Sequence, residues 1–138
     1  MAALRLAGIG YWLWRHDTKR MQWSDESYRL FGQAPGSEAP TYDSYLALIS
    51  DEDRVRVRAA WAGTRELGID FDLTYEIVTA AGDRRFVHSC GEAKRDSSGA
   101  AIAIIGIHQD GGASRNGADT GTSQILAAAA HDMRQPLH

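Results

Sequence analysis

Residues 131–138, with the sequence HDMRQPLH, contain the residue types in this chain that are best suited to covalent chemistry. His131 is followed directly by Asp132, and Pro136 lies five residues after the histidine. An imidazole ring can act as a nucleophile, and a neighbouring carboxylate can accept the proton that the ring loses when it attacks. The pattern therefore predicts a nucleophilic histidine in this segment.

The spacing of apolar residues predicts that this histidine lies on a helix. Leu126, Ala130, Met133 and Leu137 follow one another at intervals of four, three and four residues, which is typical of a coiled-coil-like seam. His131 lies ~100° around the helix from that seam, so its ring would flank a dimer interface and stay accessible. The alternative is that this tail is unstructured and that the histidine has no role.

Three further side chains, Tyr75, His88 and His108, lie on predicted neighbouring strands and could line a ligand pocket. Four-residue turns between these strands would place Tyr75 opposite His88 and bring His108 near His88. Cys90 would share a face with His88, so a haem or metal site can be considered. No Cys-x-x-Cys or His-x-x-x-His spacing supports it, and packing is the commoner role of such histidines. We therefore predict no metal site and no bound cofactor in this chain.

Length, composition and charge indicate a globular domain with a tail. The 138 residues are 43% hydrophobic and 24% charged, and their net charge of -3 indicates neither a nucleic-acid partner nor contact with an anionic membrane. Cys90 is the only cysteine, which excludes an intrachain disulfide and fits a reducing cytosol. No apolar run approaches the ~20 residues of a membrane span. We predict a cytoplasmic location for this segment, which is compatible with a membrane anchor upstream in a longer protein.

The apolar pattern predicts five strands and three helical segments. The strands are expected at residues 9–15, 20–23, 71–78, 84–94 and 100–109. The helical segments are expected at residues 24–32, 42–49 and 50–67. Polar turns at residues 80–83 and 96–99 join the last three strands. The first two strands are needed to complete the sheet, so we predict an α+β domain in which helices cover one face of a five-stranded antiparallel sheet.

Five short motifs, in this order, resemble the PAS subclass common in bacterial sensor kinases. They are residues 10–14 (GYWLW), 23–32 (WSDESYRLFG), 50–54 (SDEDR), 82–87 (GDRRFV) and 99–110 (GAAIAIIGIHQD). The resemblance implies the PAS fold and a sensory role for residues 9–110. The family closes with Asp-Ile-Thr, whereas here Asp110 is followed by two glycines. Light-sensing flavin members carry an asparagine-cysteine motif in the helical half, whereas Cys90 falls in a predicted strand, so the resemblance implies no covalent flavin adduct.

Residues 131–137 resemble the phosphoacceptor box of sensor histidine kinases. By this resemblance, His131 receives phosphate from ATP, Asp132 is the general base and Gln135 positions water for dephosphorylation. Pro136 would bend the helix one turn after the histidine. We therefore expect a PAS sensor domain at residues 9–110, a flexible linker at 111–121 and the truncated start of the phosphoacceptor helix at 122–138.

The same resemblance describes a longer parent protein. That parent would be a homodimeric sensor histidine kinase that uses ATP and Mg²⁺ and passes phosphate to the receiver domain of a response regulator. These 138 residues contain no ATP-binding motif, so alone they should be inactive. The alternative is a PAS sensor that binds haem or another small ligand and acts mainly as a binding and dimerisation module.

Overall fold

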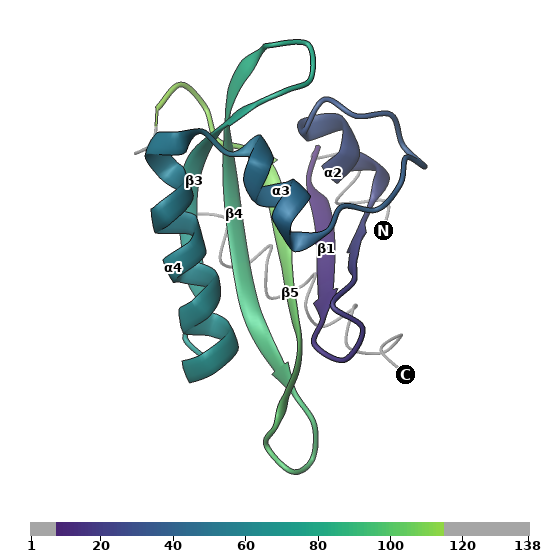
Figure 1. The fold of residues 1–138 in the computed structure, drawn as a ribbon, viewed down its shortest axis with the longest axis vertical. Coiled ribbons are helices and arrows are strands. Elements are labelled where there is room, and N and C mark those ends of the chain that lie inside the picture. The colour runs from purple at the N-terminus through teal and green to yellow at the C-terminus, as the bar shows by residue number, and fades with distance from the viewer. Residues whose placement is uncertain (1–7, 115–138) are drawn as a thin grey trace.

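The structure, a computed structural model, describes residues 8–114, and these form an antiparallel sheet with helices on one face (Figure 1). The elements in chain order are β1 (Gly10–Arg15), β2 (Met21–Trp23), α2 (Asp25–Leu30), α3 (Tyr42–Leu48), α4 (Asp51–Leu67), β3 (Phe71–Val78), β4 (Arg84–Arg95) and β5 (Ala101–Asp110). The predicted α+β class and five strands are confirmed. Each strand bound differs from its predicted position by one residue or none.

The strand order in the sheet is β2-β1-β5-β4-β3, with every neighbouring pair antiparallel. The last three strands form the predicted meander, and β1 then pairs with β5, with Trp12 opposite Gly106. This pairing joins the first and last strands of residues 8–114, so β1 and β2 complete the sheet as predicted. β2 and β3 are left as its two edges.

The core lies between the helices and the inner face of the sheet, and it is rich in aromatic rings. The Trp12 and Trp61 rings stack with their centroids 4.9 Å apart, and the Trp23 and Phe31 centroids are 4.5 Å apart. Gly106 makes room for the Trp12 ring, because a Cβ atom there would lie 2.7 Å from that ring and 1.9 Å from the Cys90 carbonyl oxygen. The inner face is therefore packed by the protein's own rings.

Helix α4 has the ends that its sequence predicts. Three acidic residues occupy its first turn, where the positive end of the helix dipole favours them. The helix ends at Gly68, whose φ of 70° is a backbone conformation that glycine adopts most readily. Val57, Trp61 and Thr64 form its buried stripe. None of the helices within residues 8–114 is long and apolar enough to cross a membrane.

The loop between β3 and β4 has five residues, not the predicted four. Val78 pairs with Arg84, because Thr79 belongs to the loop. The Thr79 backbone N–H donates to the Asp83 carbonyl at 2.9 Å, and the Thr79 hydroxyl accepts from the Asp83 N–H at 3.1 Å. Tyr75 consequently lies opposite Val87, and the prediction that it faces His88 is wrong. A shift of one residue moves a side chain to the other face of the sheet.

The loop between β4 and β5 is also longer than the predicted turn at residues 96–99. Arg95 pairs with Ala101, and a register irregularity between Lys94 and Arg95 then shifts the strands by a further residue. His108 therefore pairs with Ser89, on the face opposite to that of His88. The prediction that His108 and His88 come together is wrong for this reason.

The outer face of the sheet carries two smaller apolar clusters. Leu13, Ala103 and Ile105 form one of them. Ile9, Cys90 and Ile107 form the other, towards the end of β5. His88 lies on the same face as the second cluster, because it is two residues from Cys90 along β4.

Candidate functional site

His108 lies at the centre of the inner core, beneath α2. Its ring stacks on Trp12 with centroids 5.7 Å apart and meets the edge of Phe31 at 4.9 Å. Its Nδ1 atom lies 3.0 Å from the hydroxyl of Ser27, on α2. The Ser27 hydroxyl also donates to the backbone carbonyl of Tyr11 at 3.2 Å. Since a hydroxyl has one proton to donate, the Ser27 oxygen accepts from His108, which places the ring proton on Nδ1.

The environment of His108 keeps its ring neutral. Burial lowers the pKa of His108 to about 3, because the surrounding apolar rings cannot solvate a charged imidazolium. Gly10 pairs with His108 across the sheet, and a Cβ atom at that position would lie 2.2 Å from the Ser27 hydroxyl. The contact between α2 and the sheet at this point therefore requires glycine in β1.

Tyr75 faces the same core and forms a buried pair with Tyr45 of α3. Their hydroxyl oxygens are 2.8 Å apart, so each satisfies the other in a region without water access. Burial raises the pKa of both phenols, and the nearby Tyr75 raises the pKa of Tyr45 further. The Tyr45 ring lies 6.3 Å from the Tyr75 ring and 6.5 Å from the His108 ring. Two of the three predicted pocket residues thus share one core.

His88, the third predicted pocket residue, belongs to a separate cluster on the outer face. Its Nε2 atom lies 2.5 Å from Asp72 Oδ1 and 3.9 Å from Cys90 Sγ. Asp72 lies directly opposite Cys90 across the β3–β4 pair. His88 and Cys90 are buried, whereas the Asp72 side chain is 52% exposed. The arrangement brings together a sulfur, a nitrogen and an oxygen atom that could bind a metal ion, on β4 and the edge strand β3.

The thiol of Cys90 is a poor nucleophile in this setting. Burial raises its pKa to about 12, and the negative charge of Asp72 adds to that effect. Asp72 was not among the residues singled out by the sequence. The alternating pattern of β3 predicts that Asp72 lies on the polar side of the strand. Only the observed register shows that this side chain lies beside His88 and Cys90.

A buried carboxylate ties α4 to the edge strand β3. The Asp53 side chain is 3% exposed, and its Oδ2 accepts the backbone N–H of Glu76 at 2.8 Å. Its Oδ1 lies 3.3 Å from Arg56, and the same guanidinium donates to the Thr74 carbonyl at 2.6 Å. These bonds fix the helix against β3, and so they also fix the strand that carries Asp72 and Tyr75.

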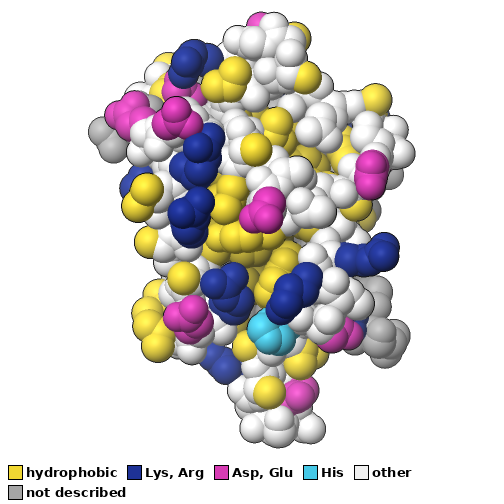
Figure 2. Space-filling model, viewed as in Figure 1, with side chains coloured by type: hydrophobic (Ala, Val, Ile, Leu, Met, Phe, Trp, Pro, Cys, Tyr) yellow, Lys and Arg dark blue, Asp and Glu magenta, His cyan; other side chains and the backbone are white. Residues whose placement is uncertain are grey.

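The helix-covered face carries a row of basic side chains over α4, beside a gathering of apolar ones (Figure 2). The row is interrupted by acids of the same helix. Arg54 lies 2.8 Å from Asp51, and Arg65 lies 3.8 Å from Glu66. The pattern is that of a solvated helix with paired charges.

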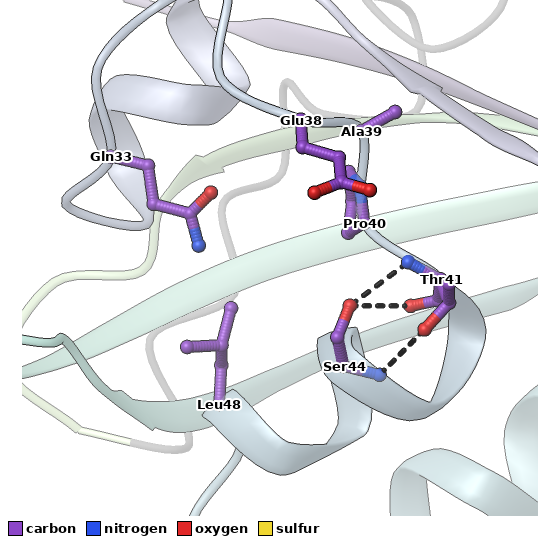
Figure 3. A pocket seen from close by; sticks show the side chains of 7 residues that line it. All are labelled: Gln33, Glu38, Ala39, Pro40, Thr41, Ser44 and Leu48. Atoms are coloured by element: carbon purple, nitrogen blue, oxygen red, sulfur yellow. Dashed lines mark hydrogen bonds between the residues drawn. The ribbon is translucent and has the colours of Figure 1, made fainter.

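A hollow of about 350 Å³ lies beside α3 and is lined by Gln33, Glu38, Ala39, Pro40, Thr41, Ser44 and Leu48 (Figure 3). Thr41 and Ser44 are paired there: the Ser44 N–H donates to the Thr41 hydroxyl at 3.0 Å, and the Thr41 N–H donates to the Ser44 hydroxyl at 2.9 Å. These bonds cap α3. The polar groups of this hollow serve the helix start, so we assign no ligand to it.

The predicted phosphoacceptor residues His131, Asp132 and Gln135 lie outside the described residues, as does most of the predicted linker. Within the described part, the Gly111 N–H donates to the Phe86 carbonyl at 2.8 Å. The chain therefore remains hydrogen-bonded to β4 just after β5 ends.

The fold and its motifs agree with a comparison against known protein families. The family described as the PAS fold matches residues 20–108, which is more than half of the chain. The chain belongs to the PAS fold family. The matched residues lie inside the predicted PAS range of 9–110.

Relatives of this PAS domain include proteins named as sensors and kinases. The sensor protein FixL of Bradyrhizobium diazoefficiens is 28% identical over 109 residues, which cover 78% of this chain and 21% of that protein. The blue-light-activated histidine kinase of Brucella ovis is 31% identical over 109 residues, with the same two coverages. The chain thus spans about a fifth of the length of the curated relatives it matches.

A solved structure confirms the fold. The crystal structure of a sensory box histidine kinase/response regulator from Burkholderia thailandensis matches with a TM-score of 0.68 at 24% identity. The match covers 97% of this chain and 96% of that one.

Proposed function

We propose that this PAS domain is the sensory input domain of a sensor histidine kinase, joined to the start of its phosphoacceptor helix. The observation that carries the proposal is the sequence HDMRQPL at residues 131–137, which follows a PAS domain in the same chain. The two relatives named as a sensor protein and a histidine kinase support the same assignment.

The proposed reaction is phosphoryl transfer to His131. A ring nitrogen attacks the γ-phosphorus of ATP, a nitrogen–phosphorus bond forms, and the bond to the departing ADP breaks. Asp132 accepts the proton that the imidazole loses. The phosphoryl group then passes to an aspartate of a response regulator, and Gln135 positions water when the phosphate is removed by hydrolysis. The ATP and Mg²⁺ would be bound by a domain outside these 138 residues, and the proposal includes a cytoplasmic location for the reaction.

The proposal includes a homodimer. The apolar seam of Leu126, Ala130, Met133 and Leu137 would pair two helices and leave His131 at the flank of the pair. Light scattering after size exclusion should give twice the chain mass for the parent protein. A monomer at high protein concentration would contradict the dimer.

Phosphorylation of the parent protein tests the assignment of His131. Incubation with ATP and Mg²⁺ should give an acid-labile phosphate on the parent, and His131→Gln should abolish it. His138→Gln is the matched control, because that histidine lies seven residues further along the same segment and outside the HDMRQPL motif. Asp132→Asn should slow the labelling by about 10²-fold or more. Labelling that survives His131→Gln would refute the proposal.

A second candidate function is a PAS sensor that binds haem or a small ligand in its inner core. The observation that favours it is the buried, neutral His108 ring, whose Nε2 atom is the acceptor nitrogen in the tautomer assigned above. Trp12, Phe31 and Tyr45 pack around this ring, so a large cofactor would have to displace them. An absorbance spectrum of the purified protein decides: a haem or flavin band favours the cofactor sensor, and aromatic absorption alone favours the protein-packed core.

A further inference from the structure

We propose that Asp72, His88 and Cys90 form a binding site for a divalent transition-metal ion, with Zn²⁺ as the best match. The site lies on the outer face of the sheet, across the β3–β4 pair, away from the helices and from the inner core. It is independent of the kinase proposal, because it uses none of the residues assigned to phosphoryl transfer.

The distances between the three ligand atoms suit one metal ion. The carboxylate oxygen, the imidazole nitrogen and the thiol sulfur all lie within 4.8 Å of one another. Tetrahedral Zn²⁺ bound through nitrogen, sulfur and oxygen needs ligand atoms roughly 3.3–3.6 Å apart. The separation of His88 Nε2 and Cys90 Sγ, 3.9 Å, is close to that value. Asp72 Oδ1, at 2.5 Å from the same nitrogen, must move by ~1 Å, which a half-exposed side chain on an edge strand can do.

The types of ligand select the class of metal. A thiolate and an imidazole favour Zn²⁺ and other borderline or soft metal ions over Mg²⁺ or Ca²⁺, which prefer oxygen. Three protein ligands leave one position of a tetrahedral ion open to water. Binding would exchange the Cys90 thiol proton for the metal, because the ligand is the thiolate.

An unpaired buried hydroxyl beside the cluster gives a second, independent observation. Thr74 lies directly opposite His88 across the strand pair, on the same face, and is 3% exposed. Its hydroxyl has no hydrogen-bond partner among residues 8–114. Buried hydroxyls are usually hydrogen-bonded. The hydroxyls of Tyr42, Ser50 and Ser89 also lack a partner among the described residues, but Thr74 is the one that lies directly opposite His88. A water molecule on the open position of the metal would supply that partner.

The site is accessible to solvent and lies beside the segment that follows β5. The Asp72 side chain is 52% exposed on the edge strand β3, so the site is open to solvent at this ligand. Gly111 packs beside Thr74 and the backbone of His88: a Cβ atom there would lie 2.9 Å from Thr74 Cγ2 and 3.1 Å from the backbone nitrogen of His88. The metal would therefore be bound where the chain leaves the sheet.

Cobalt binding to the purified 138-residue protein tests the site. Co²⁺ should give a thiolate-to-metal charge-transfer band at one equivalent per chain, and Zn²⁺ should remove it by displacement. Because the chain has a single cysteine, any such band reports Cys90. Cys90→Ala should abolish the band, and Asp72→Asn should weaken the affinity for Co²⁺ and Zn²⁺ at least about tenfold. Asp72→Asn is the decisive variant, because its exposed position lets the domain fold.

Two controls separate this site from other metal ligands. Asp70→Asn changes an exposed carboxylate two residues away and should leave the affinity unchanged. The double variant His131→Gln and His138→Gln should also leave the charge-transfer band unchanged. Absence of the band, or equal metal affinity in the Asp72→Asn variant and the parent sequence, overturns the proposal. Neither result affects the kinase proposal, since no ATP is present.

Discussion

The Ser27 hydroxyl on α2 and the His108 ring on β5 form a buried hydrogen bond of 3.0 Å, although 81 residues separate them in the chain. Ser27 and His108 are both fully enclosed, at 0% and 1% exposure. The bond joins α2 to β5, and the aromatic rings around it exclude water. Protonation of His108 is therefore coupled to unfolding of the domain.

Stability should fall as the pH is lowered through the range in which His108 titrates in the unfolded chain. Burial lowers its pKa to about 3 in the folded domain, against an ordinary value near 6.5, so the unfolded state binds more protons between these values. Stability from this source is complete above pH 6.5 and is lost as the pH falls below it. Between pH 7.5 and 5.5 the loss should be about 1.4 kcal/mol of the free energy of unfolding.

Urea denaturation at the two pH values measures this effect. His108→Gln should reduce the difference between them by about 1.4 kcal/mol. His16→Gln is the matched control, because His16 is exposed on the β1–β2 turn and should leave the difference nearly unchanged. An equal pH dependence in the His108→Gln variant and the parent sequence would show that His108 titrates normally in the fold.

The helices and strands could be predicted from this sequence because their patterns are local. The contacts between strands could not be predicted, because they depend on the register of strand pairing. The alternation in β3 and the glycine that ends α4 are visible in the residues themselves. The register of β4 depends on Thr79 joining a loop and on an irregularity at Lys94, which the apolar pattern does not encode. The neighbours of His88 follow from that register, so Asp72 could not be assigned to it beforehand.

Asp53 should contribute far more than Asp51 to the free energy of unfolding, although both lie in the first turn of α4. Asp53→Ala leaves the part-buried Glu76 N–H without this acceptor and removes the ion pair with Arg56, at a cost of about 2 kcal/mol. Asp51→Ala removes a pair whose carboxylate side chain is 94% exposed, and its effect should stay within about 0.5 kcal/mol. Chemical denaturation of both variants makes the comparison, and similar losses would mean that only the helix dipole matters.

The Tyr45 and Tyr75 hydroxyls should be energetically coupled. Tyr45→Phe or Tyr75→Phe alone leaves the other hydroxyl buried without its partner 2.8 Å away, which should cost about 1–2 kcal/mol. The double variant removes both polar groups, so its cost should be smaller than the sum of the two single costs by about 0.5–1 kcal/mol or more. A double-mutant cycle from denaturant curves gives this number. Additive costs would mean that each hydroxyl has an independent partner.

Two glycines should respond in opposite ways to the same added methyl group. Gly63 lies within α4, and a Cβ atom there meets nothing within 4 Å, so Gly63→Ala should raise the free energy of unfolding by about 0.5–1 kcal/mol. Gly106 lies under the Trp12 ring, and a Cβ atom there would come within 1.9 Å of the Cys90 carbonyl oxygen. Gly106→Ala must therefore push β4 and Trp12 away from β5, at a cost of several kcal/mol, on the order of 3 or more. Thermal unfolding of both variants measures the contrast. A Gly106→Ala domain as stable as the parent sequence would mean that the central strands do not approach as closely as described.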